Sequence, residues 1–206
     1  MSQFFTIHSK DPQQRLINEV VETLQQGGVI VYPTDSCYAL GCHIGDKAAM
    51  ERICRIRNIG NKHNFTLVCR DLSEIAIYAR VDNSAYRLLK ASTPGPYTFI
   101  LRATGEVPKR LQNPKRKTIG IRVPENPIAH ALLESLGQPL MSSTLILPGE
   151  SMPLTDPVEI WERLEHDVDA VIDGGFCGYE PTTVVELMSG TPQVTRQGRG
   201  ESSRFG

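Results

Sequence analysis

The sequence contains few cysteines, and no two of them have the spacing of a metal-binding or redox motif. There are five cysteines, an odd number, and none belongs to a Cys-x-x-Cys pair. An odd count without paired spacing argues against a disulfide framework and against a zinc ribbon. We therefore expect buried free thiols and no metal site.

Long apolar runs and an excess charge of one sign are also missing. No apolar run approaches the roughly 18 residues of a membrane span, and residues 1–5 lack the basic start of a secretory signal. The 22 Lys and Arg residues against 23 Asp and Glu residues give a net charge of −1, which removes the simplest argument for indiscriminate binding to nucleic acids or membranes. We expect a soluble cytoplasmic protein without membrane contacts.

Several common catalytic motifs are absent as well. The sequence has no G-x-x-x-x-G-K-[ST], G-x-G-x-x-G or H-E-x-x-H pattern and no recognisable Ser/His/Asp set. These absences disfavour a P-loop enzyme, a dinucleotide-binding enzyme of the usual type, a zinc protease and a serine hydrolase.

Helical and strand patterns alternate along all 206 residues without a domain break. An apolar stripe at Leu16, Val20, Val21 and Leu24 predicts the first helix, with Asp11 as its N-cap. Further helices are predicted over 47–57, 71–79, 83–90, 128–136 and 158–164, and extended segments over 29–32, 65–69, 97–102, 118–123, 139–147, 170–172 and 183–187. This order predicts a single α/β domain over residues 1–206, with a twisted mixed sheet and flanking helices. Residues 201–206 are expected to be flexible unless they dock.

Charge is balanced overall but not locally. Residues 102–122 hold seven basic residues against one acid, and residues 52–70 hold five, Lys62 among them, against none. Residues 150–173 hold eight acids and a single arginine. If the basic segments fold onto one face, that face forms an anion site. The alternatives are that they pair with the acidic stretch, or that Lys115, Arg116 and Lys117 form a solvated loop.

Two polar segments follow or form predicted strands and offer anion-binding groups. The hydroxyls of Thr34 and Ser36 come directly after the strand over 29–32, where α/β sheets place ligands, although this segment is also an ordinary turn. In the strand over 118–123, alternation puts Thr118, Gly120 and Arg122 on one face. An arginine on a covered face needs a counter-anion, either a ligand or an internal carboxylate.

A further polar segment lies near the end of the chain. Thr182 and Thr183 begin a predicted strand, and Arg196 and Arg199 follow in a glycine-rich stretch. These groups can grip phosphate oxygens, and the alternative is an edge strand with a solvated tail.

These motifs, in this order, resemble the YrdC-like family, which includes the threonylcarbamoyl-AMP synthases, and within it the YciO branch. The resemblance extends roughly from Gly27 to Gly200. Its pieces are YPTDSCYALG (32–41), PGPYT (94–98), IRVP (121–124), DGG (173–175), PTTVV (181–185) and TRQG (195–198). It implies a twisted α/β fold around a concave basic cavity, with ligands of nucleotide or RNA type.

The synthases join L-threonine, bicarbonate and ATP, usually with Mg²⁺, into threonylcarbamoyl-AMP and pyrophosphate for tRNA modification. By resemblance, the substrate-binding residues are Thr34, Ser36, Arg122 and Thr182. The nucleotide- or phosphate-binding residues are then Arg55, Arg57, Thr118, Thr144 and Arg196. An RNA-binding surface is expected at Arg110, Lys115, Arg116 and Lys117.

The chain departs from the synthase pattern at two places. The Lys-x-Arg pair of the synthases corresponds either to Arg55 and Arg57 or, without gaps, to Arg57 and Ile59. Their Ser-x-Asn sequence corresponds to residues 144–146, where Thr144 keeps a hydroxyl and Ile146 replaces the amide. Losing one polar contact to a charged group costs on the order of 1.5–3 kcal/mol, so full synthase activity is not expected.

Three functions follow from these observations. The first is binding of double-stranded RNA or tRNA, of a nucleotide, or of both in the basic cavity. The second is a weak or altered-specificity threonylcarbamoyl-AMP synthase with ATP and Mg²⁺. The third is a structural or regulatory role without a ligand. The sequence fixes neither the physiological substrate nor the oligomeric state.

Overall fold

The chain is built on one ten-stranded mixed sheet whose order is β1-β8-β2-β3-β7-β4-β6-β5-β9-β10. A computed structural model describes residues 1–60 and 63–206, so Lys62 lies outside the described residues. The strands are β1 (Gln3–Thr6), β2 (Ile30–Tyr32), β3 (Ala39–His43), β4 (Thr66–Val68), β5 (Tyr97–Arg102), β6 (Thr118–Arg122), β7 (Leu140–Thr144), β8 (Ala170–Asp173), β9 (Thr183–Glu186) and β10 (Gln193–Arg196). Parallel and antiparallel pairs alternate irregularly, which confirms the mixed sheet expected from the sequence.

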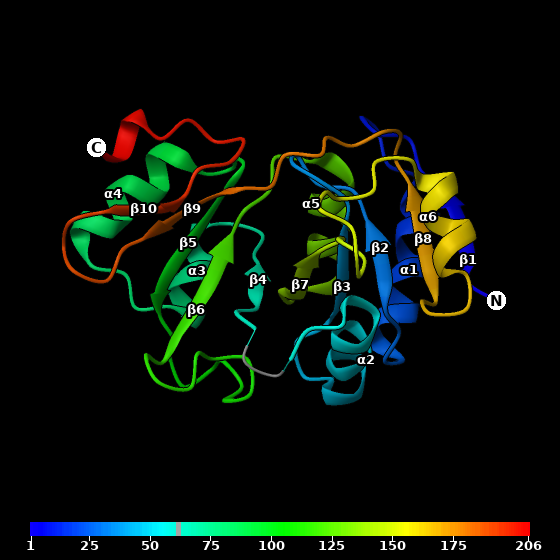
Figure 1. The fold of residues 1–206 in the computed structure, drawn as a ribbon, viewed down its shortest axis with the longest axis horizontal. Helices are drawn as coiled ribbons and strands as arrows, with labels where there is room; N and C mark the ends of the chain where they lie inside the picture. Colours follow the sequence, from blue (N-terminus) through cyan, green and yellow to red (C-terminus); the bar gives the residue numbers. More distant parts are fainter. Residues whose placement is uncertain (61–62) are drawn as a thin grey trace.

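Six α-helices flank this sheet. They are α1 (Gln14–Gln25), α2 (Lys47–Arg57), α3 (Leu72–Tyr78), α4 (Asn83–Ser92), α5 (Pro127–Leu136) and α6 (Pro157–Leu164). In Figure 1, α3 and α4 lie beside the half of the sheet that contains β5, β6, β9 and β10, whereas α1, α2, α5 and α6 lie beside the other half. None of the helices formed by the described residues is both long and apolar enough to cross a membrane.

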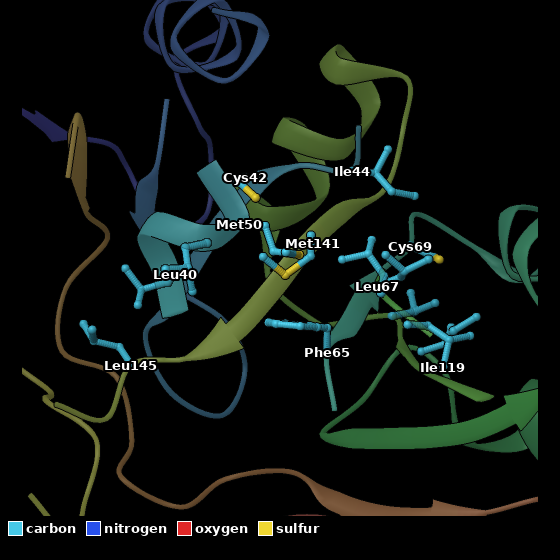
Figure 2. Packing of buried hydrophobic residues seen from close by; sticks show 14 of the residues in the cluster. Leu40, Cys42, Ile44, Met50, Phe65, Leu67, Cys69, Ile119, Met141 and Leu145 are labelled. Atoms are coloured by element: carbon cyan, nitrogen blue, oxygen red, sulfur yellow. The ribbon is translucent and has the colours of Figure 1, made fainter. Parts of the chain in front are cut away.

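Alternating side chains of the buried strands pack into two hydrophobic clusters. In β2, Val31 enters the larger cluster, while Ile30 and Tyr32 enter the smaller one together with α1 and α5. Figure 2 shows part of the larger cluster, where side chains such as Leu40, Met50 and Met141 come together from β3, α2 and β7. Strands whose two faces both lie in such clusters are positioned firmly, and they carry the loops described below.

Three strands and one helix cap differ from the sequence-based expectation. The strands β1, β3 and β10 were not predicted, and β9 is not an edge strand because it lies between β5 and β10. The first helix begins after Gln13, whose side chain makes no capping hydrogen bond, so the predicted Asp11 cap is wrong. The five caps Asp46, Asp71, Asp82, Asn126 and Asp156 do accept hydrogen bonds from backbone N–H groups.

The end of the chain docks against the sheet. Residues Ser203–Phe205 form a short 3₁₀ helix, and the buried Phe205 ring meets Tyr97 and Phe99 edge-on at centroid distances of 5.5 and 6.1 Å. The sequence predicted a flexible tail unless it docks on the domain. In this structure the tail docks through Phe205.

Candidate functional site

The polar side of the sheet encloses a cavity of about 370 Å³. Strands from both halves of the sheet line it, together with the end of α2 and the loop before β6. Seven of the residues singled out in the sequence lie on its wall: Arg57, Arg116, Thr118, Arg122, Thr144, Thr182 and Arg196. Residues from distant parts of the chain therefore meet in one basic hollow.

The β6 strand forms the floor of this cavity. Thr118, Gly120 and Arg122 line the hollow, while Ile119 and Ile121 enter the hydrophobic core, as the alternation predicted. A Cβ atom at Gly120 would lie 3.0 Å from Thr66 Oγ1 and 3.3 Å from the Phe65 carbonyl oxygen. Glycine at this position therefore keeps the floor open and lets β4 lie close to β6.

Arg122 has an internal counter-ion. Its Nη2 forms an ion pair with Asp35, and its Nη1 donates to Ser36 Oγ at 3.2 Å. The two charged side chains are only 9% and 10% exposed, and Arg122 Nε has no hydrogen-bond partner among the described residues. Of the two counter-anions that the sequence allowed, the structure contains the internal carboxylate, and Ser36 acts on the cavity through Arg122.

The hydroxyl of Thr34 is engaged within its own loop. It donates to the Cys37 carbonyl oxygen at 2.6 Å and accepts from the backbone N–H groups of Ser36 and Cys37 at 3.1 and 3.2 Å. Thr34 is buried and is not among the residues that line the cavity. Its expected contact with a substrate stays a prediction, whereas its role in shaping the turn before Tyr38 is visible.

Arg196 reaches the cavity from the edge strand β10. Its Nη2 donates to the carbonyl oxygen of Thr182 at 2.8 Å and lies 3.2 Å from Thr182 Oγ1, which is 2.7 Å from Thr98 Oγ1. Although much of the residue is exposed, partial burial of its guanidinium group and the nearby charge of Arg122 lower the pKa of Arg196. No carboxylate of the described residues lies within ion-pair distance of it.

Arg57 enters from the last turn of α2. Its Nη1 donates to Ser143 Oγ at 2.5 Å and lies 3.5 Å from His63 Nε2, and its Nε donates to the Ile146 carbonyl oxygen at 3.4 Å. Desolvation lowers the pKa of Arg57. Among the described residues, no carboxylate pairs with it.

Under either alternative for the Lys-x-Arg pair, one of its two residues lies away from the cavity wall. Arg55 is exposed and absent from the cavity wall, because residues two apart on a helix point to different sides. Ile59 packs against the hydrophobic core. Only one cation of this segment, Arg57, therefore lines the cavity among the described residues.

The residues predicted to bind RNA have different surroundings. Arg110 donates to the backbone carbonyl groups of Ile44 and Gly45 at 3.2 and 2.7 Å, so it fastens the loop before α2. Arg116 pairs with Glu186 on β9 through two hydrogen bonds. Lys115 and Lys117 are exposed. Two of these four residues thus have partners within the protein.

The acidic stretch over 150–173 neutralises little of the basic segments. Arg52 pairs with Asp169 at 2.7 Å, and this is the one ion pair between the two regions within residues 1–60 and 63–206. Arg116 and Arg122 find their carboxylates elsewhere. The cavity therefore keeps its positive character.

Several residues at this candidate site were not singled out in the sequence. Asp35, His63, Ser142 and Ser143 had no separate signal, although Asp35 stands inside a motif already singled out. Ser142 Oγ donates to the Leu40 carbonyl oxygen at 3.2 Å and lies 2.6 Å from the hydroxyl of Tyr32. Burial raises the pKa of Tyr32 to about 12, so its phenol keeps the proton that it can donate to Ser142.

The cysteines and acidic residues are candidate metal ligands within residues 1–60 and 63–206 of the chain. All five cysteines are free, and four of them are buried. In the described part of the chain, no three His, Cys, Asp or Glu side chains form a group that could hold a metal ion.

Comparison with known proteins identifies the family. The Sua5/YciO/YrdC family model, described as telomere recombination, matches residues 22–198. The chain is 62% identical over 205 residues to the uncharacterised protein YciO of Escherichia coli K12, with both chains covered completely. It is 29% identical over 182 residues to the threonylcarbamoyl-AMP synthase of Coxiella burnetii, covering 87% of this chain and 97% of that protein. The chain therefore belongs to the Sua5/YciO/YrdC family.

Solved structures agree with this assignment. The crystal structure of E. coli YciO matches all of both chains with a TM-score of 0.96 at 61% identity. The crystal structure of P. abyssi Sua5 complexed with L-threonine matches with a TM-score of 0.88, covering 96% of this chain and 58% of that one. At 22% identity, the second likeness concerns the fold alone.

Proposed function

We propose that the cavity binds the phosphate groups of a nucleotide. The observation that carries this proposal is the presence of four guanidinium groups, those of Arg57, Arg116, Arg122 and Arg196, in one hollow. Arg116 and Arg122 pair with carboxylates, whereas Arg57 and Arg196 have no carboxylate partner among the described residues. The cavity volume of about 370 Å³ falls within the range of roughly 300–1,000 Å³ that is typical of small-molecule sites.

Phosphate is the ligand chemistry that suits these groups. Partly buried cations lose hydration, which disfavours their charged form. A bound anion compensates for this loss because its opposite charge favours the charged form. Guanidinium groups also match phosphate oxygens with paired, directional hydrogen bonds. The hydroxyls of Thr118, Thr144 and Thr182 can complete the coordination of a phosphate group on the same wall.

A weak or altered-specificity threonylcarbamoyl-AMP synthase is the chemistry we propose for this nucleotide. Relatives named threonylcarbamoyl-AMP synthase and a Sua5 structure with bound L-threonine support it. In such a reaction a carbamate oxygen attacks the α-phosphorus of ATP, the bond to the β-phosphate oxygen breaks, and pyrophosphate leaves. Arg57 and Arg196 would stabilise the charge that develops on the phosphate oxygens. Since the described residues offer no metal-ligand cluster, Mg²⁺ would arrive bound to the nucleotide.

Removing either unpaired cation is expected to weaken nucleotide binding. We expect Arg57→Met and Arg196→Met each to raise the Kd for ATP about tenfold, which corresponds to roughly 1.4 kcal/mol for a lost charge-assisted contact. Isothermal titration calorimetry measures this. Arg15→Met is the control because Arg15 is exposed and pairs only with Glu19 on α1. Unchanged affinity in both cavity variants would contradict the proposal.

RNA binding is the second candidate, and the exposed loop before β6 favours it. Lys115 and Lys117 are exposed beside Arg116, which lines the cavity. A phosphate backbone crossing this loop would lie close to the cavity opening. Double-stranded RNA and tRNA are the ligands we propose for this surface.

Salt dependence tests this candidate. Each lysine that contacts a phosphate contributes about one unit to the slope of log K against log salt. In filter binding with double-stranded RNA and with tRNA, we expect Lys115→Gln/Lys117→Gln to lower this slope by about two units. Lys10→Gln/Lys90→Gln, at exposed positions on other elements, is expected to leave it unchanged. Absence of binding at low salt would reject RNA as a partner without affecting the nucleotide site.

A further inference from the structure

His63 is held in a fixed place on the cavity wall. Its ring meets Phe65 edge-on at a centroid distance of 5.6 Å and an interplanar angle of 75°. Phe65, labelled in Figure 2, belongs to the buried cluster and is only 2% exposed. On its polar side, Nε2 of His63 lies 3.5 Å from Arg57 Nη1. The ring is thus positioned between the rigid core and a cation of the proposed anion site.

The charged surroundings of His63 are predominantly positive. Arg57 faces it from α2, and across the cavity stand Arg196 on β10 and two paired arginines, Arg122 with Asp35 and Arg116 with Glu186. Cys54 on α2, which lies near Arg57, has a thiol pKa raised by burial, so it contributes no negative charge at neutral pH. Burial and then Arg57 lower the pKa of His63. Both effects favour the neutral imidazole in the free protein, in which an unprotonated Nε2 can accept a hydrogen bond from Arg57 Nη1.

We propose that His63 takes up a proton from solvent when a dianionic oxyanion, such as a terminal phosphate, binds beside Arg57, and then donates a hydrogen bond to that ligand. This inference rests on the proposed anion site. The bound anion offsets the charge of Arg57 and supplies an acceptor for the new N–H group of the imidazolium. Binding and protonation then stabilise each other.

The direction of the pH effect follows from this coupling. The pKa of His63 is lower in the free protein than in the complex, so the complex holds more protons at intermediate pH. Affinity therefore increases as pH falls through the interval between the pKa of the complex and that of the free protein, and it levels off outside that interval. A pKa difference of one unit corresponds to about a tenfold change in affinity.

Sulfate is the appropriate probe because it remains a dianion across the range, whereas phosphate itself gains a proton. We expect the Kd of the wild-type protein for sulfate to fall about tenfold between pH 8 and pH 5.5 at constant ionic strength. His63→Gln is expected to bind sulfate with an affinity that changes little with pH. His166→Gln is the control, because His166 is 75% exposed beside Glu165 and absent from the cavity wall, and it should retain the wild-type profile.

NMR of the histidine rings follows the protonation of His63 directly in the wild-type protein. The His63 resonance, assigned by its loss in His63→Gln, is expected to titrate about one pKa unit higher in saturating sulfate than without it. Sulfate binding with an unchanged His63 titration would overturn this inference and leave the proposed anion site intact. Failure of sulfate to bind at any pH would overturn both.

Discussion

Replacing Asp35 with alanine is expected to lower the free energy of unfolding by about 3–5 kcal/mol. The variant would leave the guanidinium group of Arg122 in a place where only 9% of its side chain is exposed, without its carboxylate. Asp35 also accepts a hydrogen bond from the backbone N–H of Glu125 at 3.0 Å, so a second donor loses its partner. Urea-induced unfolding followed by circular dichroism measures the change.

Two further variants separate charge burial from the mere loss of a side chain. Glu19→Ala removes an exposed partner of Arg15 on α1 and is expected to cost less than about 1 kcal/mol, since surface ion pairs contribute little. Asp35→Ala/Arg122→Met removes both charges and is expected to recover part of the stability that Asp35→Ala loses. If Asp35→Ala and Glu19→Ala prove equally mild, Arg122 is sufficiently hydrated by the cavity, and the ion pair is not a structural requirement.

The parts of the fold with a clear hydrophobic period were predictable. Val20, Val21 and Leu24 of the predicted stripe bury one face of α1 together with Ile17, whereas Leu16 is only partly buried. The alternation in β6 separates core residues from cavity residues. In contrast, β3 contains the small residues Ala39 and Gly41, which are typical of a loop in the sequence, and Gly41 lies close to the Tyr32 ring. The edge strand β10 has exposed side chains throughout, so no apolar alternation marks it. The formation of such strands depends on pairing with neighbouring strands rather than on the pattern of their own residues.

Site residues were predictable where the helix or strand that carries a side chain fixes its direction. They were not predictable where the contacts of a side chain come from distant parts of the chain. Helical geometry separates Arg55 from Arg57, and a period of 3.6 would have indicated that only one of them faces the cavity. Thr34 was singled out because it directly follows a predicted strand, but the sequence did not show that local backbone groups engage its hydroxyl. His63 acquires its significance from Phe65 and Arg57 together, and this combination exists only in three dimensions.

Restoring an amide at position 146 is expected to raise synthase activity. Ile146 lines the cavity, and its carbonyl oxygen accepts a hydrogen bond from Arg57 Nε at 3.4 Å. An asparagine there would place a donor and an acceptor beside the cation that we propose to contact the nucleotide. One polar contact to a charged group contributes about 1.5–3 kcal/mol, so Ile146→Asn should increase pyrophosphate release from ATP, threonine and bicarbonate about tenfold to over a hundredfold.

The comparison with Ile146→Leu decides whether polarity is the cause. Leucine keeps the size and apolar character of the side chain, so Ile146→Leu is expected to release pyrophosphate at the wild-type rate. An equal increase in both variants would mean that a change in packing, not the amide, limits the reaction. If Ile146→Asn binds ATP normally and gains no activity, the departure at this position does not limit turnover. In that case the low synthase activity is better explained by the altered Lys-x-Arg segment, because the described part of this segment supplies only Arg57 to the cavity.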